Sequence, residues 1–405
     1  MKRTIITSYA RTAIGTFLGS LKEVPVEALG AIAIQGAMRR SGLGNDQVDE
    51  VIMGHALPSG EAANIGRVCL LLAGLSETTP GFTVCRMCGS GIQAIVSAMH
   101  EIQTENAEIV IAGGTENLSR VPYYLPLSVR YQGFRNLNSE LLCANQRHSE
   151  TAQPPSMYPG LNMGLTGENV AERCQISRQD QDLFSLESHR KATAAIRSGR
   201  LAEEIVPVEI TQRKGPAVTV QVDEHPRQDT SLEALARLRP AFKKDGTLTA
   251  GNSSGVNDGA AALVVMSEGK GQELGLRPLA YVVNYAVTAL DPRIMGLGPV
   301  SAIQKLLKKA GLQLQDIDLF EINEAFAGQI LGCLKELGMY MGTPLYERVN
   351  VNGGAVALGH PVGMTGARLT GTLAYELRRR NLRYGIASAC IGGGMGIALL
   401  IENSN

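Results

Sequence analysis

The sequence predicts an α/β protein built from two repeated halves, with a long segment inserted into the first half. The first observation is an internal repeat. Four segments of the first half match four of the second in the same order: residues 8–15 with 284–291, 41–56 with 310–325, 107–114 with 383–394, and 259–268 with 394–402. Four ordered matches are hard to obtain by chance, so the chain contains two copies of one unit.

The second observation is that short buried strands alternate with amphipathic helices in both halves. Apolar residues recur at helical spacing in four segments: Ala28–Met38, Ile92–Ile102, Val300–Leu307 and Leu369–Leu377. Such alternation predicts layered α/β units. The composition agrees, because 44% of the residues are hydrophobic, 46 are Gly and only 4% are aromatic. Small residues let helices pack closely on strands.

The third observation is the long interruption between the last two strands of the first half. Residues 121–249 begin as an irregular stretch rich in Pro and Tyr and are expected to be helical over Asn169–Arg197. A long irregular segment inside a compact protein is usually a lid or a binding loop. We therefore expect a first half of residues 1–120 plus 250–277, an inserted domain of residues 121–249, and a second half of residues 278–405.

Composition excludes several classes of protein. Lys+Arg and Asp+Glu are 38 each, and aromatic residues are scarce, so nucleic acid is not an expected partner. No apolar run is long enough for a membrane span, and we expect a cytoplasmic protein. Seven scattered cysteines predict free thiols rather than a disulfide framework.

Cys88 is the first candidate for chemistry. It lies in TVCRMCGSGIQA, where a β-rich run enters a Gly-Ser-Gly turn followed by a helix. The free N–H groups and dipole of a helix N-terminus favour a thiolate, so we expect a lowered pKa and a nucleophilic role. A buried structural cysteine is the alternative.

Cys85 and Cys88 also spell C-x-x-C, the spacing of zinc and dithiol sites. A zinc site needs a second pair of ligands, and the remaining cysteines supply no such motif. We therefore expect no metal site.

The second half adds three candidates at strand ends or turns. His360 lies in the Gly-rich segment GGAVALGHPVGMTGAR, Cys390 precedes a run of glycines, and Asn323 ends a buried strand in EINEAF. Each of these residues, taken alone, could have a purely structural role. Together they occupy positions in the second repeat comparable to that of Cys88 in the first, and open α/β sheets place their sites at strand ends.

These motifs resemble those of the thiolase family over essentially the whole chain. TVCRMCGSG is similar to the nucleophile motif, and NEAFA, GGAVALGHPVGMTGAR and CIGGGMG are similar to the other three. The resemblance implies the five-layer αβαβα fold with an inserted loop domain. It also implies coenzyme A thioesters as substrates, no cofactor, and a homodimer or homotetramer.

The resemblance further implies a role for each motif residue. Cys88 would accept the acyl group, His360 would activate it, and Cys390 would move the α-proton of the second acyl-CoA. Asn323 would hold a water that, with His360, binds the enolate oxygen. The backbone N–H groups of Cys88 and Gly392 would form a second oxyanion hole. Coenzyme A contacts are implied for Arg227, Phe242, Ala250 and Ser254, and acyl-pocket walls for Met163, Met295 and Phe326.

The chain departs from the family pattern at three places. Cys85 stands where Asn is usual, Asn162 stands where biosynthetic members commonly have His, and the segment 121–162 is long. These departures bear on acyl specificity and leave the catalytic motifs intact.

The expected reaction is reversible condensation of two acetyl-CoA to acetoacetyl-CoA and coenzyme A. CGSGIQA after the nucleophile favours this short-chain reaction. One alternative is a degradative 3-ketoacyl-CoA thiolase for longer or specialised acyl chains. Another is a non-catalytic coenzyme A thioester or lipid-binding protein on the same scaffold. A ketoacyl synthase would need a second His in place of Cys390.

Overall fold

The computed structural model describes residues 2–133, 141–212 and 214–404. Its main sheet runs in the order β12-β13-β14-β11-β1-β10-β5-β3-β4, with β2 paired to β10. The strands of this sheet are β1 (Thr4–Arg11), β2 (Gly15–Thr16), β3 (Glu50–Gly54), β4 (Gly81–Val84), β5 (Ile109–Asn117), β10 (Asn257–Ser267), β11 (Ala280–Ala289), β12 (Leu319–Ile322), β13 (Tyr384–Ile391) and β14 (Met395–Asn403).

The main sheet consists of two halves with equivalent strand order. β1 and β11 join them through a short antiparallel pairing in which Thr4 faces Val282 and Ile6 faces Ala280. At the far end of the second half, Val349 forms a single parallel bridge with Phe320. This bridge occupies the place that β4 holds beside β3 in the first half. The duplicated order confirms the predicted α/β fold class.

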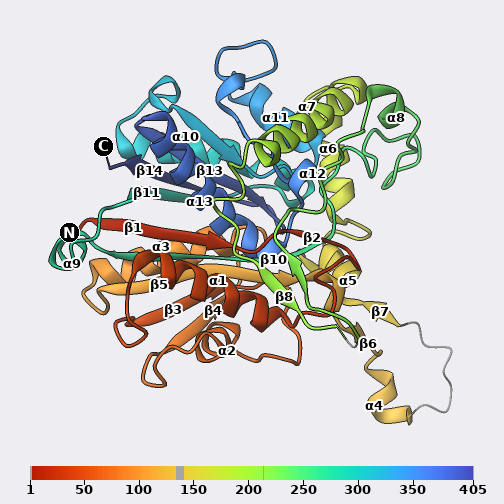
Figure 1. Cartoon of the computed structure of the whole chain (residues 1–405). Helices are drawn as coiled ribbons and strands as arrows, with labels where there is room; N and C mark the ends of the chain where they lie inside the picture. Colours follow the sequence, from red (N-terminus) through yellow and green to blue (C-terminus); the bar gives the residue numbers. More distant parts are fainter. Residues whose placement is uncertain (1, 134–140, 213, 405) are drawn as a thin grey trace.

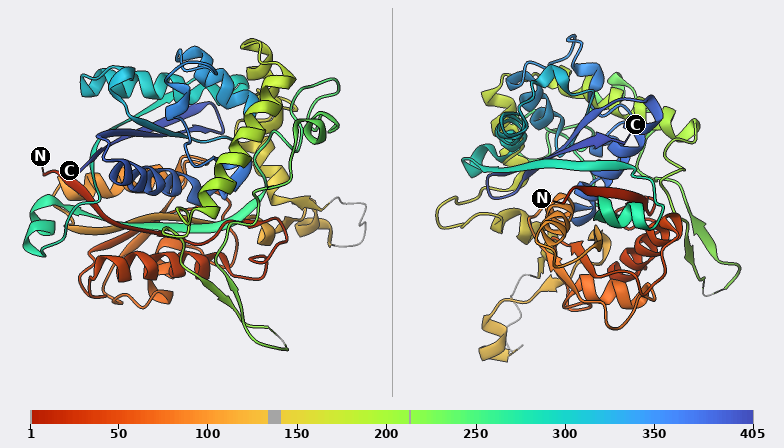
Figure 2. Two further views of the ribbon diagram at one scale, coloured as in Figure 1. Left: turned by 45° about the horizontal axis from the view of Figure 1, so that its top comes forward. Right: turned by 90° about the vertical axis from the view of Figure 1, so that its left-hand side faces the viewer.

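Helices lie on both outer faces and between the two halves of the sheet (Figures 1 and 2). Helices α1 (Val26–Ser41) and α2 (Ile65–Leu72) cover the first half, and α10 (Gly298–Ala310) and α11 (Ala327–Glu336) cover the second. Between them lie α3 (Ser90–Gln103) and α13 (Val362–Arg380), which gives five layers. Three apolar clusters fill the spaces. In β10, for example, Val264 faces the outer cluster and Val265 the central one.

Glycines allow the two central helices to approach closely. A Cβ on Gly91 of α3 would collide with the backbone nitrogen of Ala367 of α13, and one on Gly114 would collide with the carbonyl of Gly363. These contacts lie near the first turns of both helices. The N-termini of α3 and α13 are therefore brought together at the centre of the molecule.

The inserted segment contains the remaining α-helices and strands, apart from α9 (Glu268–Glu273) and α12 (Ala355–Leu358). They are β6 (Tyr123–Tyr124), α4 (Ser128–Gln132), β7 (Leu142–Cys143), α5 (Ala144–Thr151), α6 (Met163–Arg173), α7 (Arg178–Arg197), β8 (Val208–Ile210), β9 (Val218–Val220) and α8 (Leu232–Ala236). The expectation of one helical stretch over Asn169–Arg197 was wrong. The chain breaks at Cys174–Ser177, where Gln175 has φ +52° and the Ser177 side chain caps α7.

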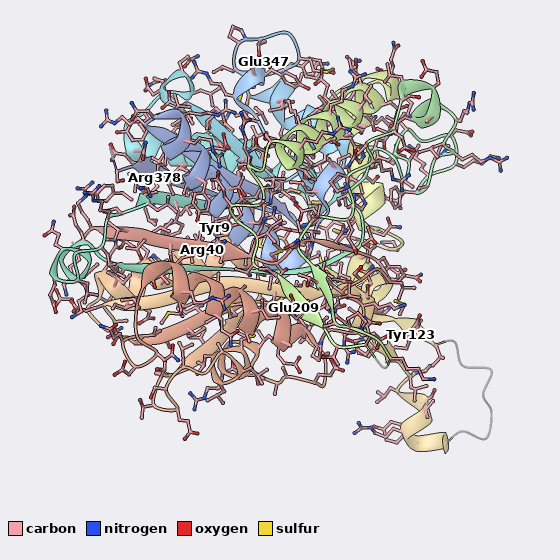
Figure 3. All side chains as sticks on the ribbon, in the orientation of Figure 1. Tyr9, Arg40, Tyr123, Glu209, Glu347 and Arg378 are labelled. Atoms are coloured by element: carbon pink, nitrogen blue, oxygen red, sulfur yellow. The ribbon has the colours of Figure 1, made fainter. Side chains whose placement is uncertain are left out.

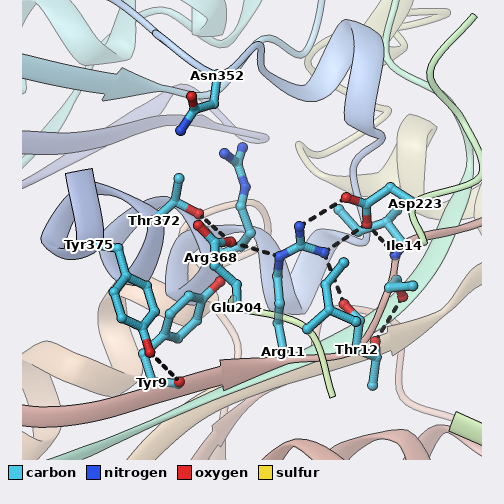
Figure 4. Close-up of polar contacts among 12 residues, drawn as sticks. Tyr9, Arg11, Thr12, Ile14, Glu204, Asp223, Asn352, Arg368, Thr372 and Tyr375 are labelled. Atoms are coloured by element: carbon cyan, nitrogen blue, oxygen red, sulfur yellow. Dashed lines mark hydrogen bonds and ion pairs between the residues drawn. The ribbon is translucent and has the colours of Figure 1, made fainter. Parts of the chain in front are cut away.

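Buried ion pairs fasten this insertion to the first strand. Arg11 is fully buried, and its guanidinium binds Glu204 at 2.9 Å and Asp223 at 2.7 Å (Figure 4). Close by, Arg40 donates to the backbone carbonyls of Tyr9 at 2.6 Å and Glu204 at 3.0 Å (Figure 3). A buried charge without a partner costs free energy, so Arg11 must stay close to Glu204 and Asp223. These ion pairs therefore hold the inserted segment against β1.

Candidate active site

Cys88 lies in a strained turn between β4 and α3. The preceding residue, Met87, has φ +45°, which non-glycine residues rarely adopt. Ser90 holds this turn, because its hydroxyl donates to the carbonyl of Met87 at 2.7 Å and accepts from the N–H of Arg86 at 2.9 Å. The thiol of Cys88 is thereby presented at the start of a helix, as the sequence predicted.

His360 lies in the equivalent position of the second half, in the loop that leads into α13. Its backbone N–H donates to Oδ1 of Asn257 at 3.0 Å, and Gly359 before it has φ +104°. Its ring is anchored by Thr365, whose Oγ1 lies 2.7 Å from Nδ1.

The hydrogen bonds of Thr365 assign the tautomer of His360. The Thr365 hydroxyl has one proton, which it donates to the carbonyl of Pro361 at 2.8 Å. It can therefore only accept from His360, so Nδ1 carries the imidazole proton. Nε2 is therefore unprotonated and can accept a hydrogen bond or a proton.

Asn323 follows the end of β12 and lies next to that unprotonated nitrogen. Its backbone N–H donates to Ser388 at 2.9 Å, and its Nδ2 lies 3.4 Å from Nε2 of His360. Oδ1 of Asn323 is buried with no hydrogen-bond partner among the described residues. Because an unpaired buried amide is costly, this pair of side chains suits a bound water or a substrate oxygen.

Cys390 and Gly392 come from the end of β13 and the turn after it. Cys390 is fully buried, and the nearby Cys88 thiol is among the groups that raise its pKa, second to burial. The backbone N–H groups of Gly392 and of Cys88 itself interact with the Cys88 sulfur. The Cys88 sulfur thus lies near a second thiol and two backbone N–H donors.

Burial sets the protonation states of Cys88 and His360. It raises the pKa of Cys88 to about 11, although the two N–H groups oppose the shift. Burial and the neighbouring Arg368 lower the pKa of His360 to about 4. The expectation of a lowered pKa at Cys88 was therefore wrong. At neutral pH Cys88 is an uncharged thiol and His360 an uncharged imidazole, and both line one cavity. A thiol in this state can act as a nucleophile only if it loses its proton as it attacks.

A cavity of about 450 Å³ opens onto these groups. The predicted site residues in its wall are Cys88, His360, Gly392, Phe242, Ser254, Met163, Met295 and Phe326. Asn323 and Cys390 are buried and do not line it. Ala250 also lies outside this wall, and Arg227 lines a separate surface hollow with His189 and Arg197.

Several residues of the site carried no sequence signal that we recognised. Asn257 and Thr365 hold His360, and Glu116 accepts from the backbone of Gly363 at 2.8 Å and pairs with the buried His55. Thr365 could have been found, since it follows His360 by about one helical turn. Glu116 belongs to the first half, so only the tertiary structure reveals its contact.

Cys85 is exposed, and its sulfur lies 3.9 Å from the carbonyl of Ala56. Within residues 2–133, 141–212 and 214–404, no group of three or more His, Cys, Asp or Glu side chains could hold a metal ion. The described helices also include none long and apolar enough to cross a membrane.

The class of protein follows from the chemistry that two thiols and an imidazole can perform. Thiols, an imidazole and N–H donors at one cavity are the groups that acyl transfer through a thioester requires, so the fold and the site are those expected of an acyltransferase. Residues 4–269 match the thiolase N-terminal domain and residues 276–403 match the thiolase C-terminal domain. The chain belongs to the thiolase family, which confirms the predicted family, fold class and enzyme class.

Individual relatives agree with this assignment. The chain is 48% identical over 397 residues to an acetyl-CoA acetyltransferase of Chromobacterium violaceum, with 98% of each chain covered. It is 47% identical to one of Escherichia coli, with 100% of each covered. The crystal structure of a Bacillus anthracis acetyl-CoA acetyltransferase superposes with a TM-score of 0.94 at 47% identity, covering 100% of this chain and 99% of that one. The crystal structure of a human mitochondrial 3-ketoacyl-CoA thiolase superposes with a TM-score of 0.92 at 41% sequence identity, covering 99% of each chain.

Proposed function

We propose that the protein condenses two acetyl-CoA molecules reversibly into acetoacetyl-CoA and coenzyme A. The observation that carries the proposal is that Cys88 and His360, both uncharged, line one cavity with Nε2 of His360 unprotonated, and that the buried Cys390 lies near Cys88. The names of the bacterial relatives support acetyl-CoA as the substrate.

The first step transfers an acetyl group to Cys88. As its sulfur attacks the thioester carbon, its proton passes to Nε2 of His360. The oxyanion is held by the N–H groups of Cys88 and Gly392, and the bond to the coenzyme A sulfur then breaks. Cys390 gives its proton to the departing thiolate. The products are acetyl-Cys88, protonated His360, the Cys390 thiolate and free coenzyme A.

The second step forms the carbon–carbon bond. The Cys390 thiolate removes a proton from the α-carbon of a second acetyl-CoA, and the enolate oxygen is held beside His360 and Asn323. The carbanion attacks acetyl-Cys88, the carbon–sulfur bond to Cys88 breaks, and His360 returns a proton to the Cys88 thiolate. Acetoacetyl-CoA leaves, and the enzyme regains its starting protonation.

Contacts to the rest of the substrate are part of the proposal. Phe242, Ser254, Arg227 and Ala250 would contact coenzyme A, and Met163, Met295 and Phe326 would bound the acyl group. Phe242 and Phe326 lie edge to face, 5.7 Å apart, in the wall of the cavity. The likeness to the human 3-ketoacyl-CoA thiolase favours one alternative, the thiolysis of longer chains. Thiolysis rates for 3-ketoacyl-CoAs of increasing length separate the two reactions.

The organisation of the chain is proposed on the same basis. Residues 121–249 would act as the lid and coenzyme A-binding domain between the halves 1–120 plus 250–277 and 278–405. We propose a homodimer or homotetramer that needs no cofactor. All seven cysteines are free, which supports a reducing compartment such as the cytoplasm.

The test is intact-protein mass spectrometry with peptide mapping after mixing with acetyl-CoA. We expect one acetyl group, on Cys88, and none in Cys88→Ala. Cys85→Asn is the matched control and should still be acetylated. An unmodified protein that nonetheless binds acetyl-CoA would instead identify a non-catalytic thioester-binding protein.

A further inference from the structure

The wall that helix α5 contributes to the cavity is polar, whereas much of the rest of the wall is apolar. Helix α5 supplies Asn145, Gln146, His148, Ser149 and Glu150, and other elements supply Met163, Met295, Phe326 and Val256. An alkyl chain gains nothing from contact with a polar wall, because groups that lose water without a partner cost free energy.

The geometry of α5 places two of these side chains over the acyl site. Asn145 and His148 are three residues apart and share one helix face, which continues to Ala152 at the end of the helix. The methyl group of Ala152 lies 3.2 Å from the position of a Cβ built on Gly392. Since the helix rises about 1.5 Å per residue, His148 lies roughly 6 Å along the axis from that contact.

Asn145 and His148 are also without partners. Both are half-buried, and neither side chain makes a hydrogen bond to any of the residues that the structure describes. The neighbouring Ser149 differs, because its hydroxyl accepts from the N–H of Met163 at 3.0 Å. The two unpaired side chains are therefore available to a ligand in the cavity.

The charges around the cavity decide what kind of ligand it can bind. Among the residues that the structure describes, its wall contains no Lys or Arg, and Glu150 is its acidic member. Burial lowers the pKa of His148, so its imidazole is neutral at pH 7 and both donates and accepts hydrogen bonds. A carboxylate would meet no cation among the described residues of this wall, whereas a hydroxyl group would be satisfied.

We propose that His148, with Asn145, selects acyl groups that carry a neutral hydroxyl group near the carbon–sulfur linkage, as in hydroxyacyl-CoA thioesters. The inference rests on the proposed acylation of Cys88 and names the substrate class of that step. The transfer itself is unchanged: the acyl carbon leaves the coenzyme A sulfur and bonds to Cys88, and the hydroxyl takes no part in the reaction. His148 acts on specificity.

The test compares two thioesters of almost equal shape, 3-hydroxypropionyl-CoA and butyryl-CoA. Rates of acylation of Cys88 are measured by rapid quench and intact mass. We expect the hydroxyacyl group to react faster by about fivefold to tenfold, the effect of one neutral hydrogen bond. His148→Leu should abolish this ratio, and His148→Gln should restore part of it. Arg147→Leu, a change at an exposed position on the same helix, should keep the wild-type ratio.

Two results would overturn the inference. In the wild type, butyryl-CoA could acylate Cys88 as fast as 3-hydroxypropionyl-CoA. Alternatively, the ratio could survive in His148→Leu. Acetyl-CoA, run in parallel, separates this failure from a wider one. If acetyl-CoA acylates Cys88 but the ratio is absent, only the specificity inference fails. If acetyl-CoA leaves Cys88 unmodified, the proposed function fails as well.

Discussion

Oγ1 of Thr365 lies 2.7 Å from Nδ1 of His360 and fixes both the orientation and the tautomer of the imidazole. The same hydroxyl donates to Pro361, so the contact is built into the first turn of α13. The basic nitrogen of His360 therefore faces the cavity before any substrate binds. Such preorganisation costs no reorganisation during the reaction.

Replacing Thr365 by Val tests this contact. The variant keeps the shape of the side chain and loses the acceptor for Nδ1–H, so the imidazole adopts the wrong tautomer part of the time. We expect acylation of Cys88 to slow by up to about 10²-fold. Complete loss of a general base typically costs at least that factor. Thr365→Ser keeps the hydroxyl and should retain most of the rate. Equal rates in the Val and Ser variants would show that the hydroxyl is unnecessary.

Cys390→Ala should separate the two steps of the reaction. Acylation of Cys88 requires no proton removal from carbon, whereas condensation does. The variant should form acetyl-Cys88 and lose condensation and exchange of the α-protons, by about 10²–10⁴-fold. Deuterium uptake into acetyl-CoA and the intact mass are measured together. Exchange at the wild-type rate would rule out Cys390 as the base.

The pH dependence of acylation should report His360. Its pKa is lowered to about 4, so the base is unprotonated at pH 7 and the rate should fall as the pH drops through about 4. Arg368 contributes to that lowering, and Arg368→Gln should therefore move the acid limb to higher pH. Burial raises the pKa of its partner Glu321 to about 8, so this carboxyl is neutral at the pH of the acid limb with or without Arg368.

Arg368→Lys keeps the positive charge and is the control for this shift. Single-turnover acylation by acetyl-CoA between pH 3.5 and 8, on protein shown to remain folded, gives the profile. An acid limb at the same pH in the Gln and Lys variants would contradict the electrostatic role of Arg368.

Arg11→Met should destabilise the fold, because it leaves Glu204 and Asp223 buried without their cation. Breaking a buried pair by removing one partner costs about 3–5 kcal/mol in the free energy of unfolding. Arg3→Met removes a more exposed pair with Glu268 and should cost no more than about 1 kcal/mol. Denaturant unfolding of both variants gives the comparison. Similar losses would mean that Arg11 is not a special anchor of the insertion.

The sequence by itself determined the duplicated α/β architecture, because buried strands and amphipathic helices leave periodic patterns in both copies. It also predicted Cys88, Asn323, His360 and Cys390 as site residues, since each lies within a short motif at a strand end or turn. It overestimated the helix at Asn169–Arg197, because apolar periodicity does not register a local break such as the one at Gln175.

Only the tertiary structure decided the state of these groups. The dipole of α3 predicted a thiolate at Cys88, but the burial that accompanies packing of α3 against α13 raises its pKa to about 11. The contact of Glu116 with Gly363 and the position of His148 in the cavity wall depend on residues far apart in the chain. Local patterns in the sequence indicate which residues will be exposed to water and which will be buried. Desolvation and contacts between distant segments arise only once the chain has folded.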